Sequence, residues 1–166
     1  MRHFDLSIVR TQGTRLTLVA LCLAAFFAFS GSAQAQGIGF QGGATIDPNQ
    51  MFVGTHFESG EIMPQFRFRP GIDGGFGNGF SLATINIEFL YSIRLKNGWA
   101  LYQGGGPAIV LLRQTVGSLH QTSTHGGTVL TFGFANESGF FTEFKLGGGS
   151  SPNLKFAVGY TVRKKP

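Results

Sequence analysis

The chain has 166 residues, of which 42% are hydrophobic and only 13% are charged, and it contains 26 glycines and 18 phenylalanines. A charged share of roughly half the usual 25% argues against an ordinary soluble α/β enzyme, and the hydrophobic content excludes a disordered chain. Beyond the N-terminal segment no uninterrupted apolar run approaches the ~20 residues of a transmembrane helix, which excludes a helical membrane protein.

Residues 1–35 have the pattern of an export signal. Three arginines accompany an apolar stretch of 14 residues (16–29), and Ala33-Gln34-Ala35 is a small-residue cleavage pattern. We therefore expect a signal peptide cleaved after Ala35, which leaves 36–166 as one domain, with an uncleaved anchor as the alternative. The one cysteine, Cys22, lies inside the apolar stretch, so the mature chain needs no disulfide.

The formal net charge of +5 overstates the basicity of the mature chain. Loss of the signal peptide leaves ten basic against seven acidic residues, a balance of +3. Three of these bases form the tail Arg163-Lys164-Lys165, which we expect to be a solvated terminus rather than a nucleic-acid patch. Export also argues against nucleic acid as a partner.

After the signal, apolar and polar residues alternate with a period of two between clusters of Gly, Asn, Asp, Pro and Ser, which is typical of strands joined by turns. The clearest example is 153–162, in which Leu154 and Phe156 alternate with Lys155. The pattern predicts eight strands, at about 37–45, 50–58, 62–73, 80–95, 99–113, 126–136, 139–147 and 153–162.

One turn predicts a register. Asn97-Gly98 is typical of a two-residue type I′ hairpin turn, in which both residues need a positive φ. Pairing Lys96 with Trp99 then places Ile93 opposite Tyr102. Apolar residues meet apolar residues in this register, so the turn and the alternation agree.

The direction of the apolar faces decides the class of barrel, because a soluble lipocalin-like barrel hides its apolar face and a membrane barrel exposes it to lipid. The polar faces carry few and balanced charges, which favours an inward network over a soluble exterior. We therefore predict an all-β, eight-stranded antiparallel up-and-down transmembrane β-barrel, with a soluble barrel as the alternative. The residues expected to form a polar network in the lumen are His56, Glu58, Arg67, Arg69, Glu88, Arg94, Glu143, Lys145 and Lys155.

The connections also favour a membrane barrel. With the N-terminus in the periplasm, the periplasmic turns 59–61, 96–98 and 137–138 are short, whereas the outer connection 114–125 is long and is expected to be a flexible loop. Aromatic residues near the periplasmic strand ends predict a girdle at one membrane interface. These interface aromatics are Tyr91, Trp99, Tyr102 and Tyr160.

Five segments carry a family resemblance: 51–56 (MFVGTH), 67–71 (RFRPG), 98–107 (GWALYQGGGP), 138–147 (SGFFTEFKLG) and 151–161 (SPNLKFAVGYT). The chain resembles the small outer-membrane β-barrel proteins of the opacity/porin-like type over most of 37–162. This resemblance implies an eight-stranded barrel in a Gram-negative-type envelope; it is specific for fold and weak for activity. Such proteins commonly end at an aromatic residue that the barrel-assembly machinery reads, whereas here Arg-Lys-Lys-Pro follows Val162.

Candidate catalytic groups are sparse. His56 and Glu58 share one inward face, but no nucleophile accompanies them, so we interpret them as members of the polar network. The outer connection could supply a metal site or a Ser-His pair, yet it contains no carboxylate and matches no ligand spacing. The residues in question there are Ser118, His120, Ser123 and His125. The sequence predicts no catalytic, metal-binding or cofactor-binding residues.

The first hypothesis for function is a non-enzymatic integral outer-membrane protein with a structural or surface-interaction role and a lumen plugged by charged side chains. The alternatives are a soluble periplasmic barrel that binds an apolar ligand and a membrane-bound hydrolase of envelope lipids. The expected partners are outer-membrane lipid and the export and barrel-assembly machineries, with a surface ligand left open.

Overall fold

The computed structural model describes residues 36–77, 80–116 and 119–163, and these residues form nine β-strands. The predicted export signal, residues 1–35, lies outside the described residues. Within this part of the chain no helix is long and apolar enough to cross a membrane. The strands are β1 (Gly37–Ile46), β2 (Gln50–Glu58), β3 (Glu61–Met63), β4 (Phe66–Gly77), β5 (Phe80–Arg94), β6 (Trp99–Val116), β7 (Leu119–Asn136), β8 (Phe140–Gly149) and β9 (Leu154–Arg163).

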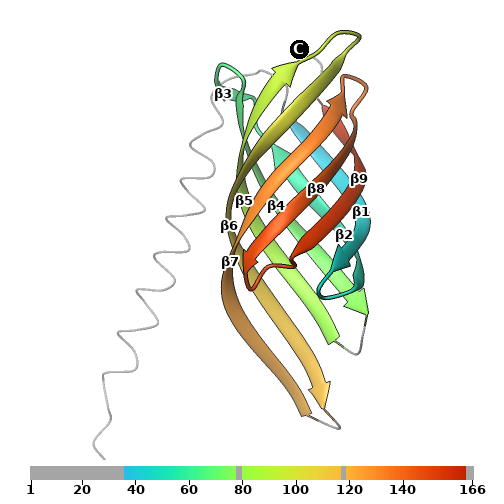
Figure 1. The fold of residues 1–166 in the computed structure, drawn as a ribbon, viewed down its shortest axis with the longest axis vertical. Coiled ribbons are helices and arrows are strands. Elements are labelled where there is room, and N and C mark those ends of the chain that lie inside the picture. Colours follow the sequence, from blue (N-terminus) through green and yellow to red (C-terminus); the bar gives the residue numbers. More distant parts are fainter. Residues whose placement is uncertain (1–35, 78–79, 117–118, 164–166) are drawn as a thin grey trace, which may run out of the picture. The chain divides into compact units, whose positions relative to one another are not determined.

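Eight of the strands close into one antiparallel barrel (Figure 1). Strands β4 to β9 pair in chain order, β9 pairs with β1, and β2 completes the ring by pairing with both β1 and β4. The ninth strand, β3, has three residues and pairs with β4 at the turn between β2 and β4. The predicted eight-stranded up-and-down fold is therefore confirmed.

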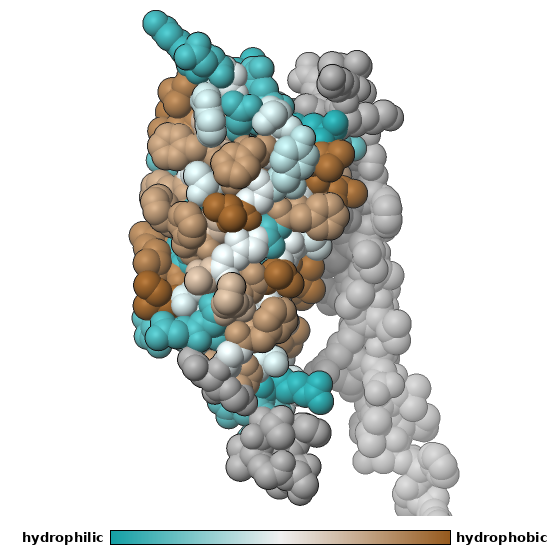
Figure 2. All heavy atoms as spheres, turned by 90° about the vertical axis from the view of Figure 1, so that its right-hand side faces the viewer, coloured by the Kyte–Doolittle hydropathy of each residue, from teal (hydrophilic) through white to brown (hydrophobic). Residues whose placement is uncertain are grey.

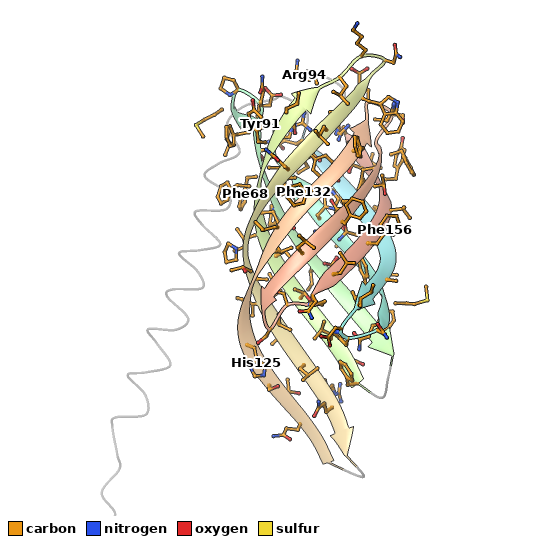
Figure 3. The ribbon with its side chains drawn as sticks, viewed as in Figure 1. Phe68, Tyr91, Arg94, His125, Phe132 and Phe156 are labelled. Atoms are coloured by element: carbon orange, nitrogen blue, oxygen red, sulfur yellow. The ribbon has the colours of Figure 1, made fainter. Side chains whose placement is uncertain are left out.

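The strand alternation turns apolar side chains outward and polar side chains inward. Ile87, Phe132 and Phe156 expose 36%, 42% and 46% of their surfaces, and Figure 3 labels the two phenylalanines on the strands facing the viewer. Asn86 and Thr131, each one residue away, are buried. Figure 2 shows the outcome as a band of apolar side chains between more polar ends. This arrangement is the reverse of a soluble barrel and is that of a barrel that crosses a membrane.

The turn between β5 and β6 differs from its prediction. Asn97 and Gly98 have positive φ values of 61° and 73°, as the Asn-Gly pair predicts, but the loop contains three residues, 96–98. The register shifts by one residue, so Tyr102 lies opposite Ser92. Because side chains alternate between faces, a one-residue shift moves Tyr102 from the lipid face into the lumen.

The outer connection 114–125 is part of a long hairpin rather than a flexible loop. Strands β6 and β7 stay paired as far as Val116 and Leu119, and the hairpin extends downward in Figure 1. Threonine recurs along this segment, at Thr115, Thr122 and Thr124, and threonine favours strands. Pairing between β7 and β8 begins only at Gly127, so in the described structure residues 119–126 of β7 project beyond the paired part of β8.

Candidate functional site

Four charged side chains form a cluster across the lumen, which we call the central layer: Arg69, Glu88, Glu143 and Lys145. Arg69 Nη2 lies 2.8 Å from Glu88 Oε2 and 2.8 Å from Glu143 Oε2. Lys145 Nζ lies 2.9 Å from Glu88 Oε1 and 3.2 Å from Glu143 Oε1. None of these side chains exposes more than 4% of its surface. Two cations and two anions therefore balance each other, as buried charges must.

The central layer joins strands on opposite sides of the barrel. Around the ring, β4 and β8 are four strands apart, and Arg69 of β4 reaches Glu143 of β8. The hydroxyl of Tyr102 on β6 donates to Glu143 at 2.8 Å, and that of Thr131 on β7 donates to Glu88 at 2.9 Å. Five consecutive strands thus contribute to the layer. It extends across a lumen that in eight-stranded barrels is just wide enough to be filled by side chains.

A second cluster, centred on Asp73 of β4, lies on the outer side of the central layer. Lys155 Nζ and Asn86 Nδ2 donate to Asp73 Oδ2 at 2.8 and 3.0 Å, and Gln41 Nε2 donates to Oδ1 at 2.6 Å. The Lys155 ammonium also lies 4.6 Å from the ring centroid of Phe52. These contacts link β1, β2, β4, β5 and β9, so the outer part of the lumen is also crossed by paired polar groups.

At the end that bears the short turns, which is expected to face the periplasm and is called the periplasmic end below, the lumen widens into a cavity of about 300 Å³. Arg69 of the central layer and Tyr102, which donates to this layer, contribute to the lining of the cavity, together with Glu58, Arg67 and Arg163. Glu58 Oε1 lies 2.6 Å from Arg67 Nη1 and 3.4 Å from Arg163 Nη2. The cavity is therefore a vestibule lined by ion pairs.

His56 is a packed interior residue. Its Nε2 lies 3.3 Å from Thr161 Oγ1, and its ring meets that of Phe141 edge-on with centroids 5.3 Å apart. Gly39 leaves room for this ring, since a Cβ at that position would collide with it. These contacts support the interpretation of His56 as part of a structural network.

Two predictions at the periplasmic end need correction. Arg163 is the last residue of β9 and lines the lumen instead of a solvated tail, whereas Lys164 and Lys165 lie outside the described residues. Arg94 exposes 76% of its side chain, and its Nη2 lies 2.8 Å from Glu61 Oε1, so it lies at the mouth of the vestibule and not deep in the lumen. The hydrogen bond from Arg94 lowers the pKa of the Glu61 carboxyl, because the cation favours its charged form.

The predicted interface aromatics divide into two groups. Trp99 and Tyr160 expose 38% and 50% of their surfaces, and Tyr91 packs on Phe66 with ring centroids 5.0 Å apart. These three residues lie on the lipid-facing surface, near the strand ends at the periplasmic end of the barrel. The prediction for Tyr102 is wrong, because its side chain is buried in the lumen.

The projecting part of β7 brings together one Ser-His pair. Ser123 Oγ lies 3.0 Å from His125 Nε2 on an exposed surface. The sequence contains no Asp or Glu between residues 89 and 136, so the hairpin offers no carboxylate to orient the imidazole. The side chains of Ser118 and His120 lie outside the described residues. Among the described residues no three His, Cys, Asp or Glu side chains come together as a metal site.

No family model and no curated protein matches the sequence. The N-terminal β-barrel domain of Pseudomonas aeruginosa OprF is similar in structure, with a TM-score of 0.67 and 11% identity over 80% of this chain and 100% of that chain. Neisserial surface protein A (NspA) has a TM-score of 0.62 and 10% identity over 79% of this chain and 97% of that chain. Ail, the attachment invasion locus protein of Yersinia pestis, has a TM-score of 0.53 and 9% identity over 78% of this chain and 97% of that chain. These similarities establish the fold, which is that of small outer-membrane β-barrels.

Proposed function

We propose that the protein is an integral outer-membrane barrel with a structural or surface-interaction role, and that its lumen is closed to solutes. The fold and the apolar outer surface support this location, because a closed barrel leaves no unpaired strand edge in lipid. A soluble carrier of an apolar ligand would need an apolar interior, whereas this interior holds ion pairs.

The proposal of a closed lumen rests mainly on the central layer. Its charges are fully enclosed and paired across the barrel, from Arg69 on β4 to Glu143 on β8. A solute would have to displace these side chains from one another, and an isolated buried ion is severely penalised. The periplasmic vestibule therefore ends at the central layer.

The projecting end of the β6–β7 hairpin supports a surface-interaction role. With the N-terminus in the periplasm, this end stands on the outer side of the membrane. It carries Ser, Thr, Gln and His side chains, and within the described structure β7 residues 121–125 have no strand partner on their β8 side. An unpaired edge of this kind can accept an extended segment of another protein.

Planar-bilayer recording tests the closed lumen. The purified wild-type protein is expected to insert without producing stable conductance steps. A variant that combines Arg69→Ser with Glu143→Ser removes the bridge across the lumen without changing its net charge, and it serves as the control that should conduct. Large and stable steps from the wild type would contradict the closed lumen and favour a pore.

A further inference from the structure

Among the described residues, one charged side chain lies on the lipid-facing surface of the barrel. At the outward positions of the described barrel strands, the residues are apolar, glycine or uncharged polar residues, except for Arg113 of β6. Arg113 is exposed and follows Ile109 and Leu111 on the same face of the strand. A charge on this face is costly near the middle of a bilayer, so its position along the strand decides what it contacts.

Strand geometry places Arg113 among the lipid head groups of the outer leaflet. It lies 14 residues beyond Trp99, which marks the periplasmic interface on the same strand. At about 3.3 Å per residue and a tilt of about 40°, this separation corresponds to ~35 Å along the barrel axis. The hydrocarbon of a bilayer is about 25–30 Å thick, and the head groups add about 5–8 Å on each side. Measured from Trp99, ~35 Å is beyond the hydrocarbon and at the level of the outer head groups.

Two hydroxyl side chains flank Arg113 on the same face. The strand register places Ser81 of β5 and Thr122 of β7 directly opposite it, one on either side. Side chains paired in this way have Cβ atoms about 5 Å apart, so each hydroxyl lies within reach of an anion bound by the Arg113 guanidinium. None of the ion pairs of the described residues involves Arg113.

The chemistry of this row matches a phosphate group. A guanidinium presents a planar fork of donors that suits phosphate oxygens, and the two hydroxyls can add further donors. Phe76 of β4, opposite Ser81 and 55% exposed, extends the row with an apolar surface for an acyl chain. The row therefore combines donors for an anion with a contact for a hydrocarbon chain, as an anionic lipid requires.

We propose that Ser81, Arg113 and Thr122 form a binding site for the phosphate group of an outer-leaflet lipid. The proposal rests on the membrane location and orientation given under the proposed function. A bound lipid at this position would fix the depth of the barrel at the outer interface, on the side from which the β6–β7 hairpin projects.

Native mass spectrometry of the refolded protein in detergent micelles, titrated with bis-phosphorylated lipid A, tests the site. Arg113→Gln should weaken lipid binding by at least about fivefold, a change in the upper range of exposed ion pairs. The lipid affinity of Arg113→Lys should lie between those of wild type and Arg113→Gln, because lysine keeps the charge but lacks the planar fork of donors. Lys96→Gln, at the periplasmic turn, is the matched control and should bind as wild type does. The wild type and all three variants should bind dephosphorylated lipid A with equal affinity.

Equal lipid A affinities for folded wild type and folded Arg113→Gln would overturn the site. An equal loss in Lys96→Gln would overturn it as well, since the attraction would then be a general effect of charge. Carbonate extraction of reconstituted vesicles separates this proposal from the proposed function. Protein released by carbonate would contradict the membrane location, whereas an integrated barrel with unchanged lipid A affinity would contradict only the lipid site.

Discussion

At the scale of single residues, Glu88 holds the central layer together. Its carboxylate accepts hydrogen bonds from Arg69, Lys145 and Thr131. Glu88→Gln keeps the size of the side chain and leaves two buried cations to share Glu143. Loss of one member of a buried ion pair costs about 3–5 kcal/mol, so the free energy of unfolding should fall by that amount. Urea unfolding in lipid vesicles measures the change.

The matched control for this change is Glu137→Gln, in the exposed turn between β7 and β8. Surface substitutions of this kind usually change stability by less than about 0.5 kcal/mol. If both variants unfolded like wild type, the central layer would not be the paired network that its distances indicate.

A glycine tests the packing of Tyr102. Gly133 lies opposite Tyr102 on the neighbouring strand, and a Cβ at Gly133 would collide with the tyrosine ring. Gly133→Ala should therefore lower the free energy of unfolding by about 1–3 kcal/mol, the usual cost of overpacking. Gly126→Ala in the same strand meets no atom within 4 Å and should be neutral. A Gly133→Ala variant as stable as Gly126→Ala would place Tyr102 outside the lumen.

The alternation of apolar and polar residues predicts which way a side chain points, but not what it contacts. It indicates the inward faces of β4, β5 and β8, and the structure places Arg69, Glu88 and Glu143 there. Their partners depend on which strands stand opposite each other across the ring, a property of closure that no local pattern contains. Arg163 was missed because its charged neighbours in the sequence favour a solvated tail.

At the scale of elements, β5 provides the sharpest test of the membrane face. Ile87 lies near the middle of β5, faces outward and pairs with Pro70 of β4. Ile87→Arg should cost about 2–4 kcal/mol if the residue lies near the bilayer midplane. Folding equilibria in lipid vesicles measure this cost, with Ile87→Leu as the control that keeps an apolar side chain. Equal stability of the two variants would show that Ile87 does not face hydrocarbon.

Asn86→Arg, one residue from Ile87, tests the lumen face of the same strand. Asn86 donates to Asp73 inside the lumen, so an arginine there would meet a carboxylate rather than lipid. Its effect should depend on Asp73 and not on bilayer thickness, whereas the cost of Ile87→Arg should fall in thinner bilayers.

Strand β6 shows why some elements were predicted incorrectly. Gly104-Gly105-Gly106-Pro107 interrupts its alternation, so the sequence alone assigns no face to Tyr102. The prediction therefore depended on the length of the turn, and one additional loop residue reversed the face. The polar sequence of 114–125 favours a loop. A strand that projects into water needs no apolar face, so its sequence lacks the alternation by which the other strands are predicted.

At the scale of the whole molecule, the fold could be predicted because the same sequence pattern recurs in most of its strands and turns. A low share of charge, alternating strands and short turns all indicate a barrel with lipid outside, and the closed ring confirms this. The proposed surface role could not be derived in the same way. It would depend on the few residues at the projecting hairpin, where no repeated pattern constrains the sequence.

The pairing of β1 with β9 has a consequence for biogenesis. This pairing brings Gly37 beside Arg163, so the first and last strands of the barrel must meet before the ring is complete. Until β1 and β9 meet, a partly formed sheet has two exposed edges that can pair with other chains. Closure therefore needs the whole segment from Gly37 to Arg163, and a chain whose ends have not met needs shielding from its own copies.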